Sequence, residues 1–358
     1  MSIARFSFTA VTRVSRFSFL LFLLVTLPFT SPLVQASELV VYTYDSLVAK
    51  HGLGPELFSR FEKQTGIRIK AVASGDAGQL LARLELDAER KKPTAQIVLG
   101  VDQNQWGRLV PLVETWGDWK PKNSDRLVPE VRALNKILPG FLPFDYGVFT
   151  FMADQKALKE QGLALPHSLK ELLGQKYHRK ILLEDPRTST PGLAFVLLAQ
   201  EIYGEKSGDF WRKFKSQWLT LAPGWDQAYG LFLKGEAPLV WSYITSQAYH
   251  REHPVKGDDP SRYLALILDE GNPVQVEGAA LVKGEWSVQT RADARKFLEF
   301  LISDEVQKEV PLKNWMMPVL SGVALPKSFQ ELPKPTKQIQ SRGSDTDVLL
   351  KRWNQALR

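Results

Sequence analysis

The strongest constraint on the fold is an alternation of strand-like and helix-like segments in the first third of the chain. Residues 38–44 and 67–72 are typical of strands, and residues 54–66 place their apolar side chains at helical spacing. Residues 79–91 predict a second amphipathic helix, and residues 96–100 predict a third strand. Helices placed between successive strands indicate an α/β fold with a mainly parallel sheet.

Polar and aromatic side chains follow these predicted strands. In open α/β sheets, ligands bind at the carboxyl ends of the strands. This rule places five residues near one rim of the sheet: Tyr44, Asp45, Ser46, Asp76 and Asp102.

A second α/β unit follows the stretch Pro143–Phe151, whose aromatic and β-branched residues favour a strand. A strand at 180–183 is followed by a loop at 185–192 that leads into a helix. No linker separates the two units, so we expect two interrupted lobes with a cleft between them. On this interpretation Pro143–Phe151 is the first crossing between the lobes, and Asp145 and Tyr146 are hinge and cleft-wall residues.

Residues 1–36 have the three parts of a secretory signal peptide: arginines, an apolar run at 17–25, and small residues ending at Ala36. The alternative is a membrane anchor, but the apolar run is short for a bilayer and prolines follow it. We therefore predict export with cleavage near Ala36.

Composition excludes several classes of function. The net charge of +7 includes three arginines of residues 1–36, which leaves a mild excess of +4. Nucleic-acid binding requires a denser basic patch than this. The chain has no cysteine, so disulfides, thiolate metal sites and cysteine nucleophiles are excluded.

Motifs that would indicate catalysis are missing from the sequence. The five histidines are scattered without metal-ligand spacing, and no nucleophile elbow, phosphate-binding loop or dinucleotide fingerprint occurs. We therefore expect a protein that is not an enzyme and that has neither a metal site nor a cofactor.

Aromatic residues beside polar turn residues are the more informative pattern. They are Tyr44, Trp225, Tyr243, Tyr249 and Trp315. Each ring alone could belong to the hydrophobic core. Together they suit a flat, cationic or heteroaromatic ligand, because the face of an aromatic ring attracts cations.

Two polar segments have a structural and a functional interpretation. Asp76 is either a turn residue or a carboxylate that accepts hydrogen bonds from an exocyclic amine and offsets a cationic ring. The loop Thr188–Thr190 is either a helix cap or a site for a phosphate or hydroxyl group.

Several segments together carry a family resemblance: residues 41–46, 143–147, 185–193, 228–236 and 314–316. Over essentially all of the chain after residue 36, the sequence resembles the periplasmic thiamine-binding proteins of ABC importers. The resemblance implies a two-lobed periplasmic-binding-protein type II fold with mixed, mainly parallel sheets and a hinge. It implies a discontinuous first lobe, 37–147 with 274–358, and a second lobe at 148–273.

The resemblance also implies a set of ligand-binding residues. Asp76 would face the ligand beside Ala77, where the family usually has glycine. Ser189 and Thr190 would contact the phosphate or hydroxyethyl end, and Trp225 would line the cleft.

The remaining implied contacts come from later segments and from aromatic residues. Tyr243, Ile244, Thr245 and Ser246 match a binding segment in which the family commonly has threonine at the position of Ile244. Rings around the thiazolium and pyrimidine would come from Tyr44, Tyr249 and Trp315.

The implied function is capture of thiamine, or of thiamine mono- or diphosphate, in a cleft between the lobes of a periplasmic monomer. Hinge closure would bury the ligand, and the closed form would deliver it to an inner-membrane ABC permease. Nucleic acid is not expected as a partner. The alternatives are a carrier for iron, a polyamine or a phosphonate, or a thiamine-processing enzyme similar to thiaminase I, whose cysteine nucleophile this chain lacks.

Overall fold

The computed structural model describes residues 7, 9, 37–254, 257, 259, 261–340 and 345–358. The predicted signal peptide, residues 1–36, lies outside the described residues except for positions 7 and 9. Residues from Ala36 to Arg358 group into one compact unit. In the described part of the chain, no helix is both long and apolar enough to span a membrane.

Strands alternate with helices as the sequence predicts. The strands are β1 (Glu38–Thr43), β2 (Arg68–Ala73), β3 (Ile97–Asp102), β4 (Leu142–Asp154), β5 (Ile181–Glu184), β6 (Trp218–Ala222), β7 (Leu239–Tyr243), β8 (Tyr263–Ala265), β9 (Asn272–Leu281), β10 (Met317–Pro318) and β11 (Gln338–Ile339). The helices before β9 are α1 (Asp45–Val48), α2 (Gly54–Thr65), α3 (Ala77–Glu89), α4 (Trp106–Leu109), α5 (Pro129–Ile137), α6 (Gln155–Glu160), α7 (Leu169–Leu172), α8 (Thr190–Tyr203), α9 (Ser207–Phe214), α10 (Trp225–Leu233) and α11 (Ser246–Glu252). The later helices are α12 (Val288–Leu301), α13 (Asp304–Gln307), α14 (Val310–Lys313), α15 (Lys327–Gln330) and α16 (Thr346–Leu357).

The strands form one mixed sheet in the order β2-β1-β3-β9-β4-β7-β5-β6. Strands β1, β2 and β3 are mutually parallel, as are β5, β6 and β7. Strands β9 and β4 lie between these two groups. Strand β9 runs antiparallel to β3 and to β4, and β4 also runs antiparallel to β7. The predicted α/β class with a mixed sheet is therefore confirmed.

Strand β4 contains the stretch predicted to cross between lobes. Its residues up to Val148 pair with β9, and its residues from Phe149 pair with β7. The chain thus passes from one parallel group toward the other within a single strand. The proposed lobe boundaries themselves stay a prediction.

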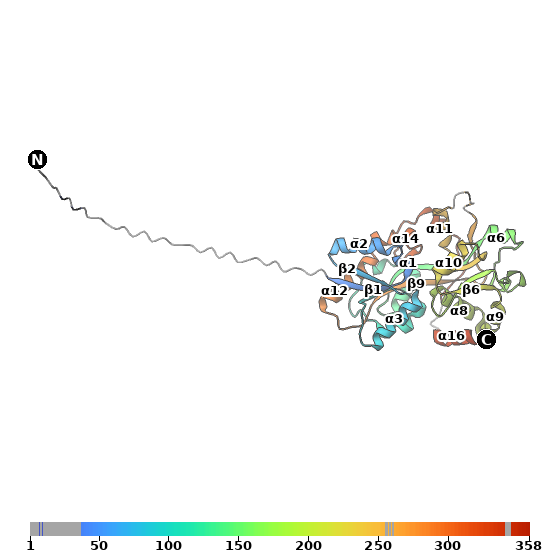
Figure 1. The fold of residues 1–358 in the computed structure, drawn as a ribbon, viewed down its shortest axis with the longest axis horizontal. Coiled ribbons are helices and arrows are strands. Elements are labelled where there is room, and N and C mark those ends of the chain that lie inside the picture. The colour runs from blue at the N-terminus through green and yellow to red at the C-terminus, as the bar shows by residue number, and fades with distance from the viewer. Residues whose placement is uncertain are drawn as a thin grey trace, which may run out of the picture. The chain divides into compact units, whose positions relative to one another are not determined.

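Two hydrophobic clusters flank this crossing. The first packs β1, β3 and β9 against helices that include α2, α3 and α12, and the second surrounds α8 and α9. In Figure 1, α2 and α3 lie on opposite sides of β1. The apolar faces that the sequence predicts on these two helices provide Leu57 and Phe61 from α2 and Leu80 and Leu84 from α3.

The last helix lies beside the second cluster. Helix α16 packs on α8 and α9 (Figure 1), and its Trp353 is buried with its ring 6.4 Å from that of Trp211. The sequence-based division assigned 274–358 to the first lobe, yet this amphipathic helix buries its apolar face on elements of the range 148–273. Helical periodicity predicts such a face, but it does not say which partner covers it.

Candidate functional site

A pocket of about 500 Å³ opens where the carboxyl ends of strands from both parallel groups meet. Its walls come from the segments after β1, β2, β5, β6 and β7, from β9, and from the segment after α14. Its lining includes Tyr44, Asp45, Asp76, Thr190, Trp225, Asp226, Tyr229, Tyr243, Ser246, Tyr249, Glu277, Lys313, Asn314 and Trp315. The rule that ligand sites form at the carboxyl ends of strands therefore locates the pocket.

The structure brings most of the predicted site residues together. Eight of them line the pocket: Tyr44, Asp76, Thr190, Trp225, Tyr243, Ser246, Tyr249 and Trp315. The other four, Ala77, Ser189, Ile244 and Thr245, are buried and do not belong to the lining. Contact with a ligand stays a prediction for all twelve.

One wall of the pocket is an aromatic stack held by hydrogen bonds. The rings of Trp225 and Tyr229 stack with centroids 4.9 Å apart at 22°, and Tyr243 lies 6.4 Å from Trp225. Trp225 Nε1 donates to Ser242 Oγ at 2.8 Å, so the indole orientation is fixed. Trp225 is half-buried against the buried Tyr229, so the stack presents a preformed apolar face to a ligand.

A second aromatic group stands at Trp315. Its ring meets that of Tyr249 edge-to-face, with centroids 4.9 Å apart. The backbone of Trp315 has φ +55°, in the left-handed region where an L-residue costs about 1–2 kcal/mol. Packing of the ring between Tyr249 and Phe329 accompanies this strain, and such strain is frequent at ligand sites.

Asp76 lies where the N-termini of three helices converge. It is the N-cap of α3, and it accepts a hydrogen bond from the Ala77 amide at 2.7 Å. Ser189 is the N-cap of α8, and Trp225 begins α10. Burial raises the pKa of Asp76, and this effect outweighs the Ala77 amide, the Ser189 hydroxyl and the Trp225 amide, which favour the charged form.

The close approach at Asp76 depends on Gly78. A Cβ on this glycine would stand 2.8 Å from the carbonyl oxygen of Thr188 and 2.9 Å from that of Arg187. The start of α3 therefore lies directly against the loop before α8. A larger residue at this position would separate the two segments.

The floor of the pocket contains a carboxyl group, that of Glu277, which the sequence analysis missed. Glu277 of β9 lines the pocket, and its register partner across the strands is Asp145 of β4. Asn314 Nδ2 donates to Asp145 Oδ2 at 2.6 Å and to the Tyr44 hydroxyl at 3.0 Å. Asp145 is fully buried beneath this layer, so it is not itself part of the pocket surface.

The floor is a strongly acidic environment. Burial, followed by mutual repulsion, raises the pKa of Glu277 well above its ordinary value, and burial raises that of Asp145. Among the described lining residues, the carboxylates are Asp45, Asp76, Asp226 and Glu277, and Lys313 is the one lysine. A pocket of this composition favours a cation, because each buried carboxylate is costly without a compensating charge.

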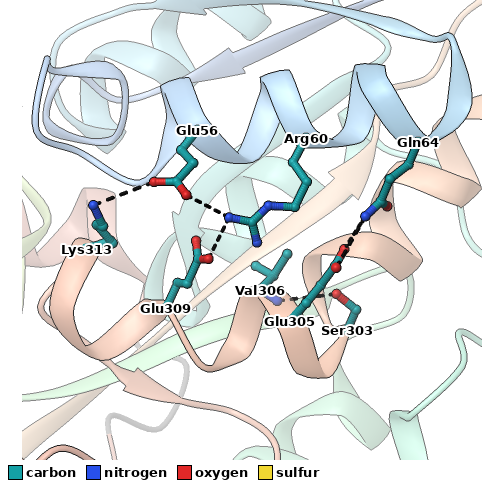
Figure 2. A network of polar contacts seen from close by, with 8 residues as sticks. All are labelled: Glu56, Arg60, Gln64, Ser303, Glu305, Val306, Glu309 and Lys313. Carbon is teal, nitrogen blue, oxygen red and sulfur yellow. Dashed lines mark hydrogen bonds and ion pairs between the residues drawn. The ribbon is translucent and has the colours of Figure 1, made fainter.

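Lys313 and the residues that follow it are held by a network on the surface (Figure 2). Lys313 Nζ lies 3.6 Å from Glu56 of α2, and Arg60 of α2 bonds to both Glu56 and Glu309. Gln64, one turn further along α2, donates to Glu305. These contacts fasten α13 and α14 to α2, and they thereby fix the start of the loop that contains Asn314 and Trp315.

The missed residues had different sequence signals. Tyr229 and Asn314 stand within segments that carry the family resemblance, so a closer look at each position in those segments would have included them. Glu277 stands alone in a buried apolar strand, where a charged residue is unusual enough to mark a site. Its pairing with Asp145 depends on strand register, which sequence alone did not supply.

Comparisons with known proteins agree with this geometry. The model of a family described as bacterial extracellular solute-binding protein matches residues 42–308. A thiamine-binding periplasmic protein of Brucella melitensis is 40% identical over 320 residues, which cover 86% of this chain and 88% of that protein. The protein of the same name in Escherichia coli is 36% identical over 336 residues, covering 90% and 93%.

Solved structures give the same result for the fold. A periplasmic thiamin binding protein superposes with a TM-score of 0.77 at 36% identity, over 90% of this chain and 96% of that one. The resemblance and fold class that the sequence predicted are thereby confirmed. The chain belongs to the family of bacterial extracellular solute-binding proteins.

Proposed function

We propose that this protein is a periplasmic carrier that binds thiamine in the pocket and delivers it to an ABC permease of the inner membrane. The observation that carries the proposal is the combination of stacked rings with a carboxylate floor. Thiamine matches both features, because its thiazolium ring is flat and permanently positive. The names of relatives at 36–40% identity over most of the chain support the same ligand and compartment.

The pyrimidine and the side chain of thiamine have their own places in this proposal. Asp76 accepts a hydrogen bond from the exocyclic amine of the pyrimidine, and Tyr249 and Trp315 enclose the ring. The hydroxyethyl end points to Thr190 at the start of α8, where Ser189 stands behind the lining. Free amides of a helix N-terminus bind phosphate, so we extend the proposal to thiamine mono- and diphosphate.

The protein has no catalytic step in this proposal and requires no cofactor. It acts as a monomer, and the closed form docks on the permease. Ligand binding favours closure if the contacts to the ligand from both sides of the pocket form together, because only a difference in affinity between two states shifts their populations.

Tryptophan fluorescence titrations with thiamine, its two phosphates and spermidine test the proposal. We expect saturable quenching and a rise in melting temperature with thiamine, because Trp225 and Trp315 line the pocket. Spermidine is the matched cation without rings, and it should bind more weakly. Absence of any response to all three thiamine forms would contradict the assignment.

Incubation with thiamine and an added nucleophile separates a carrier from a thiamine-processing enzyme. A carrier leaves the thiamine intact, so no free thiazole should accumulate over many equivalents of ligand. Release of thiazole above the rate without protein would show that the assignment as a carrier without catalysis is wrong.

A further inference from the structure

Two carboxyl groups face one another in the sheet beneath the aromatic walls. Asp145 and Glu277 are register partners on the antiparallel strands β4 and β9. Side chains at such positions stand on the same face with Cβ atoms roughly 4.5–5.5 Å apart. Asp145 is fully buried and Glu277 is 9% exposed, so solvent screens their repulsion poorly.

Each of these carboxyl groups is satisfied at one oxygen only. Asp145 Oδ2 accepts from Asn314 at 2.6 Å, and Glu277 Oε1 accepts from Gln275 Nε2 at 2.8 Å. Asp145 Oδ1 and Glu277 Oε2 are buried and make no hydrogen bond of standard geometry among the described residues. Two buried unpartnered oxygens in one acidic pair call for a proton or a cation.

Among the described residues, the surroundings of the pair do not supply that positive charge. Two further acidic groups, Asp76 and Asp102, act on Glu277 from other elements, and the Tyr44 hydroxyl favours the charged form of Glu277. The titratable and charged groups around the pair are Tyr44 after β1, Asp76 before α3, Asp102 at the end of β3, Tyr243 at the end of β7, Asp226 in α10 and Lys313 at the end of α14. Lys313 is exposed and lies beside Glu56, so it leaves the pair uncompensated.

We propose that the Asp145–Glu277 pair is the subsite that selects for the positive charge of the ligand. In the ligand-free protein, the two carboxyl groups hold one proton between them. A cationic ring in the pocket takes over the role of this proton, which passes to the solvent, and the pair becomes fully ionised. This inference rests on the proposed function, and it adds the group that distinguishes a thiazolium ring from a neutral ring of the same shape.

The layer above the pair can transmit this change. Tyr243 donates to Gln275 Oε1 at 2.6 Å, and Gln275 in turn donates to Glu277. Asn314 connects Asp145 to the Tyr44 hydroxyl. Both tyrosines line the pocket, so Gln275 and Asn314 connect the pair by hydrogen bonds to side chains that would touch the ligand.

Titration calorimetry with two probes tests the inference. The probes are thiamine and deazathiamine, in which a neutral thiophene ring replaces the thiazolium. Each titration is run near neutral pH in phosphate and in Tris, whose different ionisation enthalpies report how many protons binding releases. For the unmodified protein we expect release of about one proton per thiamine, because the pair titrates as one unit, and none with deazathiamine. Thiamine should bind roughly tenfold or more tightly than deazathiamine.

Variants locate these effects on the pair. Glu277→Gln keeps a side-chain oxygen that can accept the hydrogen bond from Gln275, and it removes the charge. The variant should therefore release no proton on binding, and its affinities for thiamine and deazathiamine should lie within about threefold of each other. Asp145→Asn should act in the same direction, and it provides a second variant if the first one folds poorly. Asp293→Asn is the matched control, because Asp293 is a buried carboxylate outside the lining that pairs with Lys296, and the loss of its charge should change neither quantity.

The possible outcomes separate the inference from the proposed function. If thiamine binds without proton release, or if Glu277→Gln retains the preference for thiamine, the inference is overturned while thiamine binding stands. If deazathiamine binds the unmodified protein as tightly as thiamine does, the inference is also overturned. If neither probe binds, the proposed function and the inference fail together.

Discussion

Replacement of Trp315 by glycine separates the role of its ring from the role of its backbone. At φ +55°, any L-residue costs about 1–2 kcal/mol, and glycine avoids that cost at the expense of about 0.5–1 kcal/mol of chain entropy. Trp315→Gly should therefore unfold at a slightly higher denaturant concentration than Trp315→Ala. The comparison reports backbone strain alone, because both variants lack the ring.

Loss of the Trp315 ring should weaken ligand binding substantially. A cation held against an aromatic face gains about 0.5–2 kcal/mol, and the apolar area covered by the ring adds about 1 kcal/mol. The expected loss of about 1.5–3 kcal/mol corresponds to a rise in the thiamine Kd of roughly ten- to 150-fold. Both Trp315→Gly and Trp315→Ala should show it.

Calorimetric titration with thiamine of the unmodified protein, Trp315→Gly and Trp315→Ala measures this rise in Kd. Trp315→Phe is the control, since it retains a ring at the same position and should stay within about threefold of the unmodified protein. If Trp315→Gly folds normally and its Kd changes less than about twofold, Trp315 is not part of the binding surface and the assignment of this wall is wrong.

Three further predictions follow from other parts of the structure. Burial raises the pKa of Asp102 to about 6 in the folded protein, so its contribution to the free energy of unfolding is greatest below its unfolded pKa of 3.8 and falls as the pH rises through 6. In urea unfolding of the ligand-free protein from pH 4 to 7, the decline in this free energy should therefore be smaller in Asp102→Asn than in the unmodified protein by on the order of 2–3 kcal/mol, and equal declines would refute it. Arg60→Met removes the ion pair with Glu309 that helps to fasten the start of α14 to α2. It should lower the free energy of unfolding by about 1 kcal/mol and raise the thiamine Kd by about two- to tenfold; unchanged binding would show that the network only adds stability. Gly78→Ala places a Cβ 2.8 Å from the Thr188 carbonyl oxygen, so it should raise the thiamine Kd. Gly107→Ala is the control, because its Cβ meets no atom within 4 Å and the Kd should not change. Equal affinities of the two variants for thiamine would refute the close approach at α3.

The parts of the fold that the sequence predicted are those set by local periodicity. Residues 38–102 alternate between spacings typical of strands and of helices, and the structure has β1, α2, β2, α3 and β3 there. The place of helix α16 beside α8 and α9 was not predicted, because packing partners depend on contacts between residues far apart in the sequence.

The same distinction holds for the candidate site. Tyr44, Trp225 and Trp315 were found because each ring stands beside polar turn residues, a pattern visible in a few consecutive letters. Glu277 and Asp145 were not recognised as a pair, because their approach depends on how β9 and β4 are aligned. Register is set by the whole sheet and its turns, so local sequence carries little of this information.

Ile244 and Thr245 illustrate a limit of assigning residues by segment. Both stand between lining residues in the sequence, yet both side chains are buried and do not reach the pocket surface. The chain leaves β7 at Tyr243 and turns into α11 at Ser246, so neighbouring side chains point in different directions. A matching segment therefore predicts the wall of a site better than it predicts each contact.

Native mass spectrometry tests whether this pocket selects thiamine. The ligand-free protein would be mixed with equal amounts of thiamine, thiamine monophosphate, thiamine diphosphate and spermidine. The account predicts a monomer that carries one molecule of a thiamine form and no spermidine. A protein that takes up spermidine in preference to every thiamine form, or that takes up none of the four, would contradict it.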